Sequence, residues 1–487
     1  MNEREAPRRG EARRSAPGRV DRPFLYLVLL LLAVGLVMLL SASYPSAYYE
    51  LGRPTYYFVR QGRAALLGLA CMAGVSAMDY HRLRGAARPV LAIAFLLLAA
   101  VLAPGVGVVR NNARRWISLG PLGTFQPSEL AKLAVILDFS TSIAYKKDRM
   151  ATWRQGIWPY LRTLLPMMFL MSREPHLSGA VLIFGVGAVL LFVGGIRWRW
   201  VGLAVLAAGG EAALLLSGVF PYGQSRIAMW RDPFIDAGGA GYQLSQSLIS
   251  IGSGGLTGVG LGRSQQKFLF LPEEHNDFIF AIVCEELGLV GAVLILLLFA
   301  GLILRGFQIA LGARDRFGSL LAVGVVSLLA MQTFMNIGVV TGLLPTTGVA
   351  LPFFSYGGTA LLLQLVEVGI VLAVSREAGP TGGRGSRRKC PLARDTEVCG
   401  FAAPEAKGDI FSAPAGGHSH ARARGRNLWR KDPSPLDPHQ KHGGKRAKRR
   451  QRRMKRHAFE ETARLAARQG RESYCRDGAS HRPPYPL

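Results

Sequence analysis

Long apolar runs separated by short polar segments fill residues 24–375 of this 487-residue chain. A hydrocarbon core about 30 Å thick requires about 20 apolar residues in each helix that crosses it. The runs that reach or approach this length lie at 24–43, 62–79, 89–108, 128–145, 159–171, 177–195, 200–220, 278–304, 319–341 and 350–375. The pattern predicts an all-α integral membrane fold with about ten transmembrane helices, of which the short fifth is either a full span or a re-entrant helix.

The two ends of the chain differ from this central region. Residues 1–23 and 376–487 are polar, basic and rich in Gly, Pro, Arg and Ser, and they contribute strongly to the formal net charge of +28. We interpret 1–23 as a cytoplasmic segment, 24–375 as the membrane domain and 376–487 as a disordered cytoplasmic tail. Binding of anionic lipid by a basic helix within 445–469 is the alternative for the tail, and nucleic acid is a less favoured partner.

Lys and Arg in short loops indicate the cytoplasmic side. With the N terminus inside, the inner loops are 81–88, 146–154, 196–200 and 305–316, and all of them are basic. Both termini are therefore predicted to be cytoplasmic. The outer loop 108–125 departs from this rule, because it places Arg110, Arg114 and Arg115 outside. This departure indicates that the arginines serve a purpose there, and basic positions without a function are the alternative.

The segment QPSELAK, after that loop, places opposite charges on one helix face. Pro127 suits the first turn of a helix, and Ser128 beside it is a candidate cap. Glu129 and Lys132 are three residues apart, so they share a face and can pair. Such a pair at the outer end of a span should face protein or water. It can be a tether between helices, a polar wall beside an outward cavity, or both.

The outer segment 221–277 is far longer than an ordinary connection, which favours a functional loop or a small folded cap. Its stretch IGSGGLTGVGLG does not fit a nucleotide-binding loop, because no strand precedes it and no GK[ST] follows. We interpret it as flexible or close-packed backbone beside a ligand. The segment ends in LPEEHNDF, where acidic residues crowd the start of an apolar run. Charge there is costly, so these residues are functional candidates.

Irregular backbone is also predicted before the last helix. Pro345, Gly348, Pro352, Gly357 and Gly358 interrupt the apolar stretch NIGVVTGLLPTTGVALPFFSYGGTALL. Broken helices at membrane depth occur where they line a cavity or are buried in protein. The stretch therefore adds irregular backbone to the outer face.

Four segments, QPSELAK, GYQLSQSLISIGSGGLTGVGLG, LPEEHNDFIFAIVCEELG and LLPTTGVALPFFSYGG, together resemble the SEDS family, which includes FtsW, RodA and SpoVE. The resemblance covers residues 20–376 in order, and it favours the FtsW/SpoVE branch over a RodA-type elongation enzyme. It implies a ten-helix SEDS fold in the bacterial cytoplasmic membrane and a peptidoglycan glycosyltransferase that polymerises lipid II at the outer face. It also implies a class B penicillin-binding protein as partner, among other divisome or elongasome membrane proteins, in cell division or in cell-shape or spore wall synthesis.

The chain departs from the family pattern at three places. Asn111-Asn112-Ala113 stands where the family has NGA, and Asn276 replaces the Thr that precedes Asp277. The QPDLG-type motif reads EPHLS at 174–178 and lacks the Asp, so no role is predicted for that loop. Asp277 itself is retained.

The resemblance implies an inverting reaction, in which an α-linked diphosphate becomes a β-linked glycan. A single displacement needs a base for the incoming hydroxyl and positive charge for the leaving group. The family places its essential Asp at Asp277, which we expect to be the base. Apolar residues follow it, and such a setting raises a carboxyl pKa. Taken alone, Asp277 would be interpreted as a helix N-cap. His275 and Glu273 are near enough to tune it, whereas Glu285 and Glu286 are expected to be structural.

Guanidinium groups suit the diphosphate, so Arg114 and Arg115 are the first candidates to bind it. Lys132 comes next, with its neighbours Glu129, Gln126 and Ser128. The irregular stretch is expected to support the site through Pro345, Ser355, Gly357 and Gly358. No organic cofactor is expected. The acidic cluster permits a divalent cation, Mg²⁺ or Mn²⁺, but no ligand spacing identifies one.

Two other functions remain open from the sequence: a lipid II flippase and a scaffold that recruits a penicillin-binding protein without chemistry of its own. A flippase needs a polar path through the whole bilayer. Buried charges apart from Glu211 and Glu367 cluster at the outer end, which favours the enzyme. A scaffold would not require Asp277.

Overall fold

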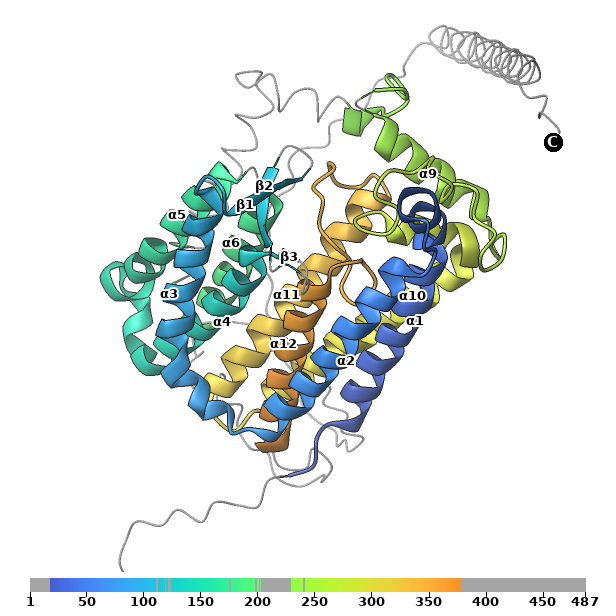
Figure 1. The fold of residues 1–487 in the computed structure, drawn as a ribbon. Helices are drawn as coiled ribbons and strands as arrows, with labels where there is room; N and C mark the ends of the chain where they lie inside the picture. The colour runs from blue at the N-terminus through green and yellow to red at the C-terminus, as the bar shows by residue number, and fades with distance from the viewer. Residues whose placement is uncertain are drawn as a thin grey trace, which may run out of the picture. The chain divides into compact units, whose positions relative to one another are not determined.

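The computed structural model describes residues 18–110, 113–118, 120, 124–174, 177–197, 199–200, 202, 229–239 and 241–377. These residues belong to one compact unit, Met1–Ala402, and they are mainly helical (Figure 1). Several predictions fall outside the described residues: the N-terminal segment up to residue 17, Asn111 and Asn112, Pro175 and His176, most of the seventh span with Glu211, and the basic tail from residue 378.

Most of the described chain is in α-helices. They are α1 (Arg22–Leu51), α2 (Tyr56–Ala77), α3 (Leu83–Leu102), α4 (Pro127–Lys146), α5 (Trp158–Arg173), α6 (Leu177–Val193), α9 (Tyr242–Gly254), α10 (Ile279–Leu311), α11 (Arg316–Val340) and α12 (Gly358–Glu377). Shorter helical turns are η1 (Tyr80–Arg82), η3 (Lys147–Ala151) and η4 (Trp153–Ile157).

Five of the described helical segments are long and apolar enough to cross a membrane. They are α1, η1 with α3, α10, α11 and α12. All five overlap predicted spans, so a predominantly helical membrane fold is confirmed, but the predicted span 89–108 is too long at its end, where α3 stops at Leu102 and β1 begins at Gly107. The count of ten spans stays a prediction, because the remaining helices are shorter or less apolar and part of the chain lies outside the described residues.

The structure corrects the start of the last span, which was predicted at residue 350. α12 begins at Gly358, and residues 350–357 form turns instead. Pro352 cannot donate a backbone hydrogen bond, and Phe353 adopts a φ of +65°. These two residues explain why the helix does not begin earlier.

A small sheet was missed by the all-α prediction. β1 (Gly107–Arg110), β2 (Ala113–Ser118) and β3 (Thr124–Phe125) form a three-stranded antiparallel sheet in the order β1-β2-β3. It follows α3 and leads into α4, and Figure 1 shows it at the same end of the helices as α9. The described residues of the loop 108–125 therefore form a small sheet at the predicted outer face.

α11 is the most enclosed of the five long apolar helices. It packs against α10, α4, α6 and α12, which together cover most of its surface. α12 packs along α2, and α10 packs along α1 and α9. α3, α4, α5 and α6 pack together beside them (Figure 1). Helices from the N-terminal half of the chain, α2, α4 and α6, thus pack against the C-terminal helices α11 and α12.

The two ends of the described chain lie on the same side of the helices. The Gly18 N–H donates to the Arg376 carbonyl at 2.9 Å, and the Asp21 N–H donates to the Ser375 hydroxyl at 3.2 Å. This contact is what two termini on one side of a membrane require. That this side is the cytoplasm stays a prediction.

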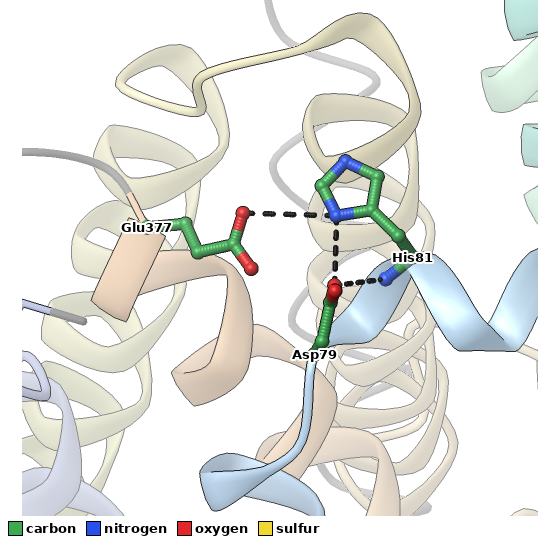
Figure 2. A group of neighbouring side chains, drawn as sticks. All are labelled: Asp79, His81 and Glu377. Atoms are coloured by element: carbon green, nitrogen blue, oxygen red, sulfur yellow. Dashed lines mark hydrogen bonds and ion pairs between the residues drawn. The ribbon is translucent and has the colours of Figure 1, made fainter. Parts of the chain in front are cut away.

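A charged cluster joins three helix ends on the same side. Figure 2 shows His81 Nδ1 at 2.8 Å from Asp79 Oδ1 and 3.7 Å from Glu377 Oε2. Its Nε2 lies 3.5 Å from Oδ2 of Asp315, whose Oδ1 caps α11 by accepting from the Gly318 N–H. The cluster therefore connects the turn after α2 to the end of α12 and the start of α11.

Candidate functional site

Asp277 lies in a segment of turns, residues 268–278, immediately before α10. The Glu273 carbonyl accepts from the N–H groups of Asn276 at 3.0 Å and Phe278 at 3.3 Å, and the Asn276 amide donates to the Glu273 carboxylate. Glu273 has a φ of +56°, which is uncommon for a non-glycine residue and closes this turn. Phe278 is the N-cap residue of α10, without a capping side chain. Asp277 is therefore not a helix cap.

The carboxyl group of Asp277 is partly buried beside charges of both signs. Burial, reinforced by the carboxylate of Glu273, raises the pKa of Asp277 to about 6 against the opposing effects of Arg115 and His275. Such a group is ionised at neutral pH and still basic enough to accept a proton. This combination is typical of a general base.

Two residues that were not predicted as site residues fix the backbone and the space at Asp277. Asn336 on α11 donates from Nδ2 to the carbonyls of Asp277 and Val349, both at 2.7 Å. A Cβ atom added at Gly348 would lie 3.0 Å from Oδ2 of Asp277, so only glycine leaves the carboxylate clear on that side. An amide inside the apolar run LLAMQTFMNIGVV is the signal that could have indicated Asn336.

Ser355 connects the segment before α12 to the Asp277 segment. Its hydroxyl donates to the Asn276 carbonyl at 2.6 Å and accepts from the Leu351 N–H at 2.8 Å. Gln61 on α2 donates to the Ser355 carbonyl at 3.1 Å and accepts from the Gly357 N–H at 3.1 Å. Ser355 and Gly357 therefore lie where a supporting role needs them. The other two predicted supporting residues are Pro345, half-buried between α11 and α12, and Gly358, the first residue of α12.

His275 is buried and packs on α2. Its ring stacks on Tyr57 with centroids 4.5 Å apart, and Nδ1 lies 3.4 Å from Oε1 of Glu274. Glu274 is in turn hydrogen-bonded by the Ser46 hydroxyl of α1. His275 and Glu274 therefore attach the Asp277 segment to α1 and α2, and His275 also acts electrostatically on Asp277.

Arg115 is the extra residue of a β-bulge. The register of β1 and β2 pairs Val108 with Trp116 and Val109 with Arg114, so Arg115 has no opposite residue. A bulge redirects a side chain, and bulges are common beside active sites. The bulge therefore gives Arg115 a different backbone setting from its neighbour Arg114, which pairs with Val109.

The bulge directs the Arg115 charge toward two carboxyl groups. Its Nε donates to the Glu174 carbonyl at 3.3 Å, and its charge acts on the carboxyls of Asp277 and Glu174. Arg114 is exposed. Of the two arginines predicted to bind the diphosphate, the structure brings Arg115 to Asp277 and leaves Arg114 in solvent.

Glu174, for which no role was predicted, belongs to this site. It follows α5 and is fully buried. Neither carboxyl oxygen has a hydrogen-bond partner among the described residues. Burial raises the pKa of Glu174 to about 8, and Arg115 opposes the rise. Pro175 and His176, which follow it, lie outside the described residues.

The glycine-rich stretch packs against a break in α10 at Gly288, where φ is +67° and ψ is −170°. The break frees backbone groups that residues 255–260 satisfy. Val259 and Gly260 donate to the carbonyls of residues 285 and 286, and the N–H groups of residues 289 and 290 donate to Gly255 and Leu256, all at 3.0–3.1 Å. The expectation of close-packed backbone is correct, but the partner that the structure shows is another part of the chain.

Gly258 and Gly262 offer a matched pair for testing this contact. Both have positive φ, but a Cβ added at Gly258 would lie 2.2 Å from the Glu286 carbonyl oxygen, whereas Gly262 has open space. We expect Gly258→Ala to lower the free energy of unfolding by about 2–4 kcal/mol, and Gly262→Ala by about 1 kcal/mol. Thermal unfolding of both variants in the same detergent measures the difference. Equal destabilisation would contradict the contact.

Glu285 and Glu286 were predicted to be structural, and their contacts agree. Glu285 accepts from the hydroxyls of Ser250 at 3.0 Å and Ser264 at 2.6 Å. Glu286 pairs with buried Lys267 at 2.8 Å and accepts from Ser41. These bonds attach the outer loop to α9, α10 and α1, and they satisfy both carboxylates away from Asp277.

The QPSELAK segment forms a charged pair, as expected. Lys132 Nζ lies 2.7 Å from Glu129 Oε2, and both act electrostatically on buried Glu367 of α12. Pro127 begins α4, but the buried Ser128 hydroxyl has no hydrogen-bond partner among the described residues, so the expected cap is wrong. Gln126 is half-buried before α4. These contacts favour a tether between α4 and α12.

The structure places the candidate cation ligands away from Asp277. Among the described residues, the group of three potential ligand side chains with atoms within 4.8 Å of one another is Asp79, His81 and Glu377. Glu377 ends the 20-residue α12, so it lies about 30 Å from Gly358 along the helix. A cation that assists chemistry at Asp277 stays a prediction.

The chain matches one family model over most of its membrane region. Residues 21–379 match the FtsW/RodA/SpoVE model, described as "Cell cycle protein". Stage V sporulation protein E of Bacillus subtilis is 43% identical over 357 residues, which cover 73% of this chain and 97% of that protein. A probable peptidoglycan glycosyltransferase FtsW of Geobacter metallireducens is 41% identical over 358 residues, which cover 73% of this chain and 95% of that protein.

Solved structures share the fold. One is described as "Structural coordination of polymerization and crosslinking by a peptidoglycan synthase complex", and its matching chain is 32% identical with a TM-score of 0.62, covering 74% of this chain and 98% of that one. The Rod shape determining protein RodA of Thermus thermophilus is 30% identical with a TM-score of 0.54, covering 74% of this chain and 98% of that one.

Proposed function

The chain belongs to the FtsW/RodA/SpoVE family, and from that membership and the Asp277 site we propose that it is a peptidoglycan glycosyltransferase that polymerises lipid II. The observation that carries the proposal is Asp277 itself. Its carboxyl group has a pKa of about 6, is held beside Arg115 and belongs to a segment bound by α1, α2 and α11.

In the proposed mechanism, Asp277 is the general base. A sugar hydroxyl of one substrate gives its proton to the carboxylate while its oxygen attacks the anomeric carbon of another. The bond from that carbon to the lipid diphosphate breaks in the same displacement, so the configuration inverts and no sugar is bound covalently to the enzyme. Ionisation above about pH 6 keeps Asp277 ready to accept the proton at neutral pH.

Arg115 is proposed to stabilise the departing diphosphate. Charge develops on the phosphate oxygens as the bond breaks, and a guanidinium group binds such oxygens with two parallel donors. The Arg115 charge acts on Asp277, whereas Arg114 is exposed. Lys132 forms an ion pair with Glu129, so we assign Lys132 a structural role in preference to binding phosphate.

The membrane arrangement is proposed in full as ten spans within 24–375, with both termini cytoplasmic and the loop 221–277 outside. The basic segments 1–23 and 376–487 would then face the cytoplasm. The contact between the two ends of the described chain supports this arrangement, since it requires an even number of crossings between them. The Asp277 site would open to the outer face of the cytoplasmic membrane.

The partner is proposed to be a class B penicillin-binding protein. The structural relative described as part of a peptidoglycan synthase complex that coordinates polymerisation and crosslinking supports this choice. Similarity to stage V sporulation protein E and to FtsW supports a division or spore wall role over elongation.

The test is reconstitution of the purified chain with lipid II, with and without a penicillin-binding protein, and with Mg²⁺, Mn²⁺ or a chelator. We expect glycan strands in the presence of the partner. Movement of labelled lipid II across the vesicle membrane without glycan would instead indicate a transporter. Partner binding with neither activity would indicate a scaffold.

A further inference from the structure

We propose that Glu174 is a positioning residue of this site: in its neutral form it leaves the Arg115 charge available to Asp277 and the leaving group, and when ionised it draws that charge away. This inference rests on the proposed polymerase function and adds a residue that no family motif in the sequence assigned.

The first support is that the Glu174 carboxyl group is buried without a hydrogen-bond partner among the described residues. A buried carboxylate without partners is strongly disfavoured, whereas a neutral carboxylic acid tolerates burial much better. Glu174 also follows the C-terminal end of α5, where the helix dipole disfavours negative charge. The neutral form is therefore the favoured state at neutral pH.

The second support is that Arg115 is shared. The Arg115 Nε–H donates to the Glu174 backbone carbonyl at 3.3 Å, and the Arg115 charge acts on the Glu174 carboxyl. The same guanidinium acts electrostatically on Asp277. One guanidinium charge therefore acts on both carboxyl groups, those of Glu174 and Asp277.

Charge balance favours the neutral form during the reaction. The ionisable groups that act on Asp277 are Arg115 from the sheet, and Glu273 and His275 from the segment before α10. Asp277 must be ionised to act as base. An ionised Glu174 would compete with the diphosphate for Arg115, because both are anions.

The proposal predicts a pH dependence that Glu174 alone controls on the alkaline side. Burial raises its pKa to about 8, so Glu174 is neutral below that pH and ionised above it. The polymerisation rate of the wild type should rise as pH increases through about 6, where Asp277 ionises, and fall through about 8. Glutamine copies the neutral acid in shape and cannot ionise.

The experiment measures initial rates of glycan formation from lipid II between about pH 5.5 and 9.5 for the wild type, Glu174→Gln and the exposed-carboxyl control Glu50→Gln. We expect Glu174→Gln to keep the rate at pH 7 within a few-fold and to lose the fall above pH 8, while Glu50→Gln keeps that fall. A fall that persists with the same midpoint in Glu174→Gln, or a wild type without one, would overturn the inference.

A second measurement does not depend on activity. Infrared difference spectra between pH 7 and pH 9 should show a loss of protonated carboxyl absorption at the higher pH in the wild type, and this loss should be smaller in Glu174→Gln. An equal loss in the variant would overturn the assignment. An inactive wild type would contradict the proposed function, whereas an active wild type with a persistent alkaline fall in Glu174→Gln would contradict only the role of Glu174.

Discussion

Asp277→Asn is expected to abolish polymerisation while leaving the protein folded. Asparagine has the same shape and cannot accept the proton of the incoming hydroxyl, so the loss should reach about 10²–10⁴-fold in kcat. The Asp277 backbone carbonyl, which accepts from Asn336, is untouched by the change. Thermal unfolding of the variant should therefore match that of the wild type within a few degrees.

The matched control for this variant is Asp232→Asn. Asp232 lies in the same long outer segment, but its carboxyl group is exposed and accepts a local bond from the Phe234 N–H at 3.2 Å. It should retain the wild-type rate. Equal rates for Asp277→Asn and the wild type would remove Asp277 from the chemistry.

Arg115→Ala is expected to produce the second largest loss, about 10²–10³-fold in kcat, because the charge on the departing diphosphate loses its stabilisation. Arg115→Lys should recover only part of the rate, since an ammonium group lacks the planar pair of donors and cannot reproduce the bond from Nε to the Glu174 carbonyl. The rate of glycan formation at saturating lipid II measures both variants.

Arg114→Ala provides the comparison for Arg115. The two residues are adjacent and identical, and only the β-bulge distinguishes them. Because Arg114 is exposed, its loss should reduce the rate by no more than a few-fold. A loss for Arg114→Ala as large as that for Arg115→Ala would mean that the diphosphate binds on the other face of the sheet.

The sequence predicted those parts of the fold that depend on one-dimensional pattern. Long apolar runs placed the helices, and opposite charges three residues apart predicted the pair of Glu129 and Lys132. Strands of two to six residues were too short to give a readable alternation, so the sheet was missed. The bulge that separates Arg114 from Arg115 depends on register, which a single sequence does not state.

Asp277 was predictable from the sequence, but the residues around it that come from other parts of the chain were not. The crowded acidic segment and the family resemblance indicated Asp277. Glu174 and Asn336 are separated from it in sequence: Glu174 is linked to it through Arg115, and Asn336 through a hydrogen bond from α11. Glu174 stands at the first position of the QPDLG-type motif, where the family has Gln, so the resemblance assigned no role to an acid there. The close approach of Gly348 to Asp277 was not predictable either, because it also depends on a tertiary contact between distant parts of the sequence.

This chain is proposed to polymerise lipid II with Asp277 as base. The most direct test compares the length of glycan strands made from lipid II by the wild type, Asp277→Asn and Asp232→Asn, each purified and reconstituted with a penicillin-binding protein whose own polymerase activity is absent. The account predicts long strands from the wild type and from Asp232→Asn, and none from folded Asp277→Asn. Strands of equal length and yield from Asp277→Asn would contradict it.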